Sequence, residues 1–281
     1  METFVAAALI GVVVGICSGL LGIGGGTLMV PIFRLGFGLS AFVSTATSLF
    51  TIIPTSLVGF VTHIKNKTCI PKIGITAGLA GACTSPLGVY LNSNSPAWAV
   101  MLAAAIIIGY SAFNMFKKAL RIPKVQAAEG GKALGVDVEK AAEAAAASQA
   151  EEPEFKFTKK SFVQALGIGL IAGLASGYVG VGGGFIMVPL FISVLGVMMR
   201  LASGTSLVAI MILAIPGVIE QALLGNINYT AGIAMAVGSI PGAVIGANLI
   251  RKIPERQLRF IFGTFLVVSA VVLLANEFMA I

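Results

Sequence analysis

The sequence predicts an all-α, polytopic membrane protein made of two inverted repeats, with about five membrane helices in each repeat and about 10 in total. Two observations on composition point to a membrane: 57% of the 281 residues are hydrophobic and only 10% are charged. A soluble domain has about a quarter charged residues. The third observation is a long sequence repeat at a shift of 158 residues (from 19 to 177), which points to two similar halves.

Charged residues are missing from five stretches, each at least as long as the roughly 20 residues that a helix needs to cross the hydrocarbon core. Backbone amides in lipid must be satisfied within their own segment, so these stretches are predicted to be helices rather than open strands. A transmembrane barrel would show short alternating segments, whereas these apolar runs are continuous. The stretches cover residues 3–33, 35–62, 73–116, 161–199 and 221–250.

A glycine-rich motif occurs twice, as GLLGIGGGTLMVPIF at 19–33 and as GYVGVGGGFIMVPLF at 177–191. The same shift relates a Thr-Ser-Leu triplet at 47–49 to one at 205–207, and it relates several isolated glycines and prolines. A shift that is kept over about 80 positions without a gap indicates a duplication.

The duplication divides the chain into a first membrane repeat at 1–118, a linker at 119–160 and a second membrane repeat at 161–281. Most of the acidic residues lie in the linker, which is therefore predicted to be a solvated connector without reaction chemistry.

Loop charges predict that the two repeats are inverted, because Lys and Arg accumulate on the cytoplasmic side of a membrane. In the first half, the loop at 63–72 carries three lysines and the loop at 91–97 carries no charge. In the second half the pattern is reversed: residues 221–230 are uncharged and residues 251–259 are basic. Equivalent loops should therefore face opposite sides, with the linker in the cytoplasm and both termini outside.

The second helix of each repeat is predicted to be short, at 26–37 and at 184–196, and each contains a proline. About a dozen residues span only about 18 Å, which is too short for an upright crossing. Short, Gly/Pro-interrupted segments at matching positions in two halves are typical of a transporter's binding site. The other membrane helices are expected near 4–22, 40–62, 73–90, 98–116, 162–180, 199–220, 230–249 and 260–277.

The three consecutive glycines before each short helix would let a ligand approach the backbone. The first amides of a helix have no intrahelical partner and form the positive end of its dipole, which suits an anion. Threonine and serine hydroxyls on the following helix could add donors, although such side chains commonly bond a carbonyl one turn back. The predicted substrate-binding residues are Gly24, Gly25, Gly26, Thr47, Ser48, Gly182, Gly183, Gly184, Thr205 and Ser206.

Several other functions are disfavoured by the composition. One histidine and three scattered cysteines do not form the ligand set of a zinc, haem or iron–sulfur site, so no metal and no cofactor are expected. No basic stretch is interleaved with aromatic residues, so no nucleic-acid partner is expected. An intramembrane enzyme would need a nucleophile–base pair, which the sole histidine, His63, expected in a loop at the inner edge, does not supply.

The doubled motif GxGGGxxMVPxF, at Gly22–Phe33 and Gly180–Phe191, each followed by Thr-Ser-Leu, resembles the sulfite exporter TauE/SafE family. The resemblance covers both halves and leaves only the linker outside. It implies a bacterial-type inner-membrane permease for small sulfur-containing anions such as sulfite, thiosulfate or organosulfonates, working by alternating access. An anion channel of the same architecture, and a transporter of a non-sulfur organic anion, remain alternatives. The expected partners are a small anionic substrate and the lipid bilayer.

Overall fold

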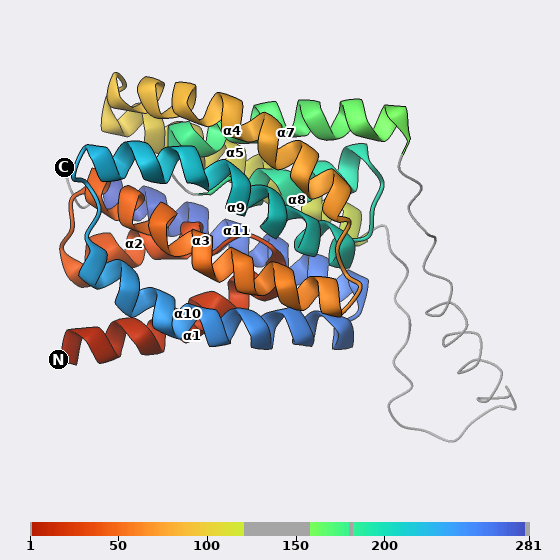
Figure 1. Cartoon of the computed structure of the whole chain (residues 1–281), viewed down its shortest axis with the longest axis horizontal. Helices are drawn as coiled ribbons and strands as arrows, with labels where there is room; N and C mark the ends of the chain where they lie inside the picture. Colours follow the sequence, from red (N-terminus) through yellow and green to blue (C-terminus); the bar gives the residue numbers. More distant parts are fainter. Residues whose placement is uncertain (1, 121–157, 180–181, 279–281) are drawn as a thin grey trace, which may run out of the picture.

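The computed structural model describes residues 2–120, 158–179 and 182–278, and every element within these ranges is helical (Figure 1). Most of the predicted linker, 119–160, lies outside the described residues. The first half contains α1 (Glu2–Leu21), α2 (Gly26–Phe37), α3 (Ala41–Lys65), α4 (Pro71–Ser93) and α5 (Ala97–Leu120). The second half contains α7 (Lys159–Val179), α8 (Gly184–Val194), α9 (Met199–Leu223), α10 (Tyr229–Leu249), the 3₁₀ turn η1 (Ile250–Lys252) and α11 (Glu255–Phe278).

Each membrane helix predicted from the sequence coincides with a helix of the structure, and the two predicted short helices are short. Helix α2 has 12 residues and α8 has 11. Five helices, α3, α4, α7, α9 and α10, are long and apolar enough to cross a membrane. The prediction of an all-helical, multi-pass membrane protein is therefore confirmed.

Local sequence explains where several helices begin. The side chain of Ser40 accepts a hydrogen bond from the Val43 N–H and caps α3, and Pro71 occupies the first turn of α4. Proline suits that position because the first N–H groups of a helix have no intrahelical acceptor. The Asn228 side chain accepts from the Ala231 N–H and caps α10.

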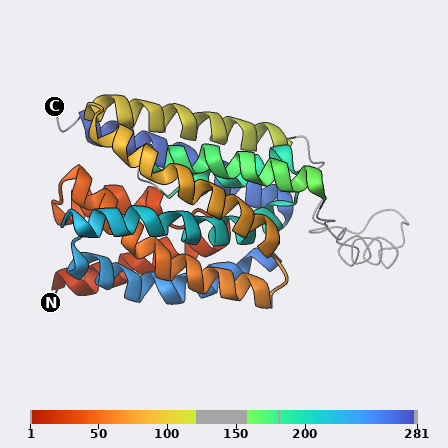
Figure 2. The same ribbon diagram turned by 45° about the horizontal axis from the view of Figure 1, so that its top comes forward.

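Two pairs of helices pack closely along the edges of the bundle: α1 against α10, and α4 against α7 (Figures 1 and 2). A Cβ added at Gly246 of α10 would overlap the carbonyl oxygen of Ile16, and one added at Gly88 of α4 would overlap that of Leu174. These four residues are related by the 158-residue shift, so the two contacts are equivalent. The isolated glycines Gly88 and Gly246 therefore serve helix packing, as small residues do in membranes.

Between these pairs, α3 and α9 cross the middle of the bundle in opposite directions (Figure 1). Gly59, late in α3, faces the side chain of Leu207, early in α9, whereas Gly217, late in α9, faces Leu49. The α1–α10 and α4–α7 pairs are parallel, because their contacts advance together along both helices. Helix α1 begins and α11 ends at one end of the bundle, and α5 ends and α7 begins at the other.

Large apolar side chains cover the outside of the bundle as well as filling its interior. Leu9, Ile106 and Tyr110 are each more than 60% exposed, while Phe33 and Phe185 are fully buried. An exposed apolar surface of this extent is typical of a protein that is surrounded by lipid.

Candidate substrate-binding site

The backbone of both glycine turns requires glycine. The φ angles are +77° at Gly24 and +84° at Gly25, and they are +86° at Gly182 and +63° at Gly183. Residues with a side chain rarely adopt this left-handed conformation, whereas glycine does so without steric cost. Gly25 and Gly183 are the residues that immediately precede α2 and α8, so the turn lets each short helix start abruptly inside the bundle.

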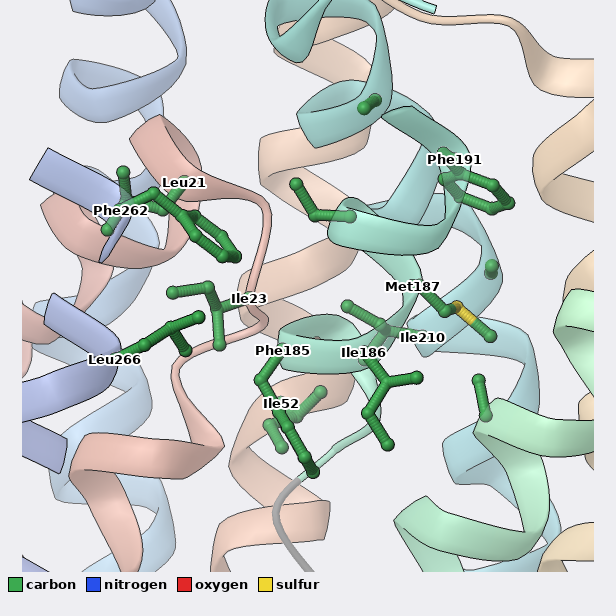
Figure 3. Packing of buried hydrophobic residues seen from close by; sticks show 14 of the residues in the cluster. Leu21, Ile23, Ile52, Phe185, Ile186, Met187, Phe191, Ile210, Phe262 and Leu266 are labelled. Carbon is green, nitrogen blue, oxygen red and sulfur yellow. The ribbon is translucent and has the colours of Figure 1, made fainter. Parts of the chain in front are cut away.

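The two turns meet at the centre of the molecule. A Cβ added at Gly24 would lie 3.0 Å from Ile210 Cγ2 and 3.3 Å from Ile52 Cγ2, and one added at Gly182 would lie 2.7 Å from Ile52 Cδ1. Ile52 and Ile210 are themselves related by the 158-residue shift. Figure 3 shows both isoleucines among the fully buried side chains between the two turns.

The starts of the two short helices present backbone N–H groups. Leu28 and Met29 both donate to the Gly25 carbonyl, at 3.1 and 3.0 Å, which closes the first turn of α2. The N–H groups of Gly26 and Thr27 have no acceptor among the described residues. They form the positive end of the α2 dipole, a natural place for an anion. Helix α8 also begins with two N–H groups bonded to the carbonyl of the preceding glycine, Gly183, but its first N–H differs: the Gly184 N–H donates to the Gly182 carbonyl at 2.7 Å.

The two predicted threonines join the halves of the protein. Thr47 Oγ1 accepts a hydrogen bond from the Asn228 N–H at 3.0 Å, and Thr205 Oγ1 accepts one from the Ile70 N–H at 2.9 Å. Both threonines are buried. Each hydroxyl oxygen therefore accepts a hydrogen bond from a loop of the other half and ties that loop to α3 or α9.

The two predicted serines are also buried, on either side of the centre. Ser206 Oγ lies 2.6 Å from the Gly22 carbonyl oxygen, to which it donates. Ser48 Oγ has no partner among the described residues, and the carbonyl at position 180, equivalent to that of Gly22, lies outside them.

The Thr-Ser pairs are not brought together. Thr47 lies before Leu49 and Thr205 before Leu207 on antiparallel helices, and Leu207 is level with Gly59. Leu207 of α9 therefore lies at the level of residue 59 of α3, ten residues along the helix axis from Leu49. The two Thr-Ser pairs lie beyond these two levels, so they are at least about 15 Å apart along the axis. The structure thus gathers the glycine turns and places the Thr-Ser pairs on both sides of them.

The prediction that His63 lies in a loop is wrong. His63 belongs to the last turn of α3 and is fully buried. Its ring contacts Gly19 of α1 on one side and Thr68, which follows the end of α3, on the other. Its Nε2 lies 2.8 Å from the Gly19 carbonyl oxygen, and its Nδ1 lies 2.7 Å from Thr68 Oγ1. A carbonyl oxygen only accepts, so Nε2 carries a hydrogen, and in the neutral ring Nδ1 is then the acceptor for the Thr68 hydroxyl, which also lies 3.3 Å from the His63 carbonyl oxygen.

Two serines that sequence reasoning did not select lie beside the glycine turns. Ser18 of α1 and Ser176 of α7 are buried, and within residues 2–120, 158–179 and 182–278 neither Oγ has a hydrogen-bond partner. The sequence did contain a signal, because Ser18 and Ser176 are related by the same 158-residue shift as the glycines. In the part of the chain that the structure describes, no group of His, Cys, Asp and Glu side chains could hold a metal ion.

Comparison with known proteins identifies the family. The family model described as Sulfite exporter TauE/SafE matches residues 7–273. YunE of Bacillus subtilis, described as a probable membrane transporter protein, is 25% identical over 274 residues, which cover 94% of this chain and 95% of YunE. YdhB of the same organism, described in the same words, is 27% identical over 246 residues, covering 87% of this chain and 89% of YdhB.

A plant protein is similar over a shorter region. Sulfite exporter TauE/SafE family protein 3 of Arabidopsis thaliana is 30% identical over 120 residues, which cover 41% of this chain and 25% of that protein. The family match spans both glycine turns and all but the outermost ends of the described helices. The chain therefore belongs to the sulfite exporter TauE/SafE family and is a multi-pass membrane transporter.

Proposed function

We propose that this transporter moves small sulfur-containing anions, such as sulfite, thiosulfate or organosulfonates, by alternating access between two inverted repeats. The observation that supports it most is the meeting of the two glycine turns at Ile52 and Ile210, where two helix starts direct backbone N–H groups into the bundle. Gly24 to Gly26 and Gly182 to Gly184 supply these amides.

Helix directions support the inverted repeats. Helices α1, α3 and α10 run one way, and α4, α7 and α9 run the other way (Figure 1). The 158-residue shift pairs α1 with α7, α3 with α9 and α4 with α10, so the members of each pair are opposed. Alternating access by rocking of one repeat against the other is the usual mechanism of such an architecture, with the substrate near the middle of the membrane.

The character of the buried polar groups supports an anion as the substrate. Within the described residues, the buried polar side chains are serines, threonines, His63 and Gln221, and none is a carboxylate. A cation pathway would be lined by acidic groups or by several oxygen ligands. Neutral donors and the positive ends of two helix dipoles favour a negative solute.

Flux into proteoliposomes tests the substrate class. We expect saturable uptake of ³⁵S-labelled sulfite or thiosulfate, with competition by sulfoacetate and little competition by acetate. Uptake of carboxylates without uptake of any sulfur anion would refute the sulfur specificity. Steady currents under voltage clamp would instead favour an anion channel, for which the absence of buried carboxylates in the described helices is the supporting observation.

Topology can be tested by single cysteines in a bacterial inner membrane, which is the location that the family resemblance implies. Asn66 and Asn226 lie in the loops after α3 and α9 and are both partly exposed. Asn66→Cys should react with an impermeant reagent from the cytoplasm only, and Asn226→Cys from outside only. In this arrangement the linker is cytoplasmic and both termini are outside. Labelling of both cysteines from one side would remove the inversion.

A further inference from the structure

Ser18 and Ser176 carry buried hydroxyl groups that no described residue bonds. Each side chain is only 1% exposed, and neither Oγ has a hydrogen-bond partner among the residues that the structure describes. Most buried polar side chains have a partner, and one that lacks a partner in the protein calls for a water, an ion or a ligand. The same feature occurs at equivalent positions of both halves, which argues against an accident of packing in one place.

Both serine side chains lie beside the glycine that immediately precedes a short helix. A Cβ added at Gly183 would lie 3.4 Å from Ser176 Oγ, and one added at Gly25 would lie 3.6 Å from Ser18 Cβ. In the first half, the adjacent N–H groups of Gly26 and Thr27 have no acceptor among the described residues. Each serine side chain therefore lies close to the start of a short helix, where backbone N–H groups are potential donors.

Apolar side chains separate these two sets of donors. Ser18 lies on α1, which packs against α10, and Ser176 lies on α7, which packs against α4 at the opposite edge. Ile52 and Ile210, together with Ile23 of the first turn, pack between the two glycine turns (Figure 3). A small hydrated anion cannot rest among these buried isoleucines without losing its hydrogen bonds.

We propose that the anion binds at two half-sites, one at Ser18 and the start of α2, the other at Ser176 and the start of α8. The barrier formed by Ile52 and Ile210 separates them. This inference rests on the proposed function, because it takes the transported solute to be an anion. Each half-site offers O–H and N–H donors to an oxoanion group, such as the sulfite or sulfonate head, and the amides offer nothing to a cation.

The two half-sites differ in their polar side chains at one position. Thr27 of α2 is fully buried, and its Oγ1 also lacks a partner in the described part of the chain, whereas the equivalent position in α8 is the fully buried Phe185. The half-site of Ser18 therefore has one more hydroxyl donor than that of Ser176. We expect it to bind an oxoanion more tightly.

The test is the affinity of the purified full-length protein for thiosulfate, measured by calorimetry for three alanine variants. Ser18→Ala and Ser176→Ala each remove one donor to a charged ligand, so each should raise Kd at least about tenfold, with the larger rise for Ser18→Ala. Ser269→Ala is the matched control, because Ser269 on α11 is also 1% exposed and its Oγ also has no partner among the described helices and loops. Its Kd should be that of the wild type.

The near-isosteric Ser18→Cys and Ser176→Cys keep the shape but donate weakly, so they separate a lost donor from lost packing. They should weaken binding while they elute as folded protein in size-exclusion chromatography. If the wild type binds thiosulfate and the alanine and cysteine variants of Ser18 and Ser176 all bind it with the same Kd, the half-sites are overturned and the proposed function stands. A wild type that binds neither thiosulfate nor sulfite would instead overturn the proposed function, and the half-sites with it.

Discussion

The loops that follow α3 and α9 occupy equivalent positions in the two halves and share their backbone geometry. Lys67 and Gly225, which are 158 residues apart, both have positive φ angles, of 57° and 71°. Each loop also donates a backbone N–H to a threonine of the other half, Thr205 for the first loop and Thr47 for the second. The duplicated backbone is thus held by the same bonds on both sides.

The side chains at these two loops differ. In the first half, His63 bonds both to Thr68 of its own loop and to the carbonyl of Gly19 in α1. In the second half the equivalent residues are Gln221 and Asn226, and the Asn226 amide donates to Gln221 Oε1 at 2.8 Å. The first pair ties α3 to α1, whereas the second pair closes only its own loop. The two loops therefore share their backbone geometry and differ in the hydrogen bonds that their side chains make.

The largest effect should come from breaking the shared backbone at the glycine turns. Gly25→Val and Gly183→Val place a β-branched residue at φ angles of +84° and +63°, and Gly183 also has the Ala172 carbonyl oxygen 3.3 Å from an added Cβ. We expect each variant to insert into the membrane and to lose anion uptake in proteoliposomes, because the helix starts shift.

Gly36→Val is the control for these variants, because nothing lies within 4 Å of a Cβ added at Gly36. It should keep most of the uptake. Normal uptake by both turn variants would show that the turns do not hold the substrate. Loss in one variant alone would show that the halves are unequal in function as well as in side chains.

The sequence predicts the repeated features of the fold well and the contacts between halves poorly. Both short helices begin at the predicted residues, Gly26 and Gly184, because local chemistry determines these starts. The partners of Thr47 and Thr205 lie 181 and 135 residues away along the chain. No local pattern specifies such bonds, so the hydroxyls were expected to be donors to a ligand and are found as acceptors for backbone N–H groups.

Two other residues show the same limit. The charged residues near His63 indicate a loop, and its burial depends on the end of α1, 44 residues earlier. Ser18 and Ser176 repeat in the sequence, but hydroxyls in membrane helices usually bond their own backbone. Only the three-dimensional structure shows that these two do not.

A moderate effect should distinguish the two polar pairs. His63→Ala removes the partner of the Gly19 carbonyl and that of Thr68 in a fully buried place, so it should lower the free energy of unfolding by about 2–4 kcal/mol. Gln221→Ala breaks one bond to the partly exposed Asn226, so it should cost about 1 kcal/mol. Thermal unfolding of both variants in the same detergent measures the difference. Equal shifts would show that the tie to α1 contributes nothing.

The smallest effect concerns Cys69, which lies in the first loop where the second loop has Ile227. Burial raises the pKa of the Cys69 thiol to about 12, and a hydrogen bond with Thr205 opposes this rise. The thiol is therefore protonated at neutral pH, and its thiolate forms only when the pH rises toward 12. Since the thiolate is the nucleophile, a maleimide at pH 7 should label Cys69 at least about tenfold more slowly than a cysteine at the exposed Lys67.

The measurement needs two proteins, both with Cys17 and Cys83 replaced by alanine. One keeps Cys69, and the other carries Cys69→Ala together with Lys67→Cys. Both should transport normally, because a neutral thiol here is equivalent to the apolar Ile227 of the other half. Rapid labelling of Cys69 would mean that this loop opens to water, and the two loops would then differ in mobility as well as in side chains. Slow labelling with intact transport would mean that Cys69 and Ile227 play the same part in the two loops. Any functional difference between the loops would then come from His63 and Gln221.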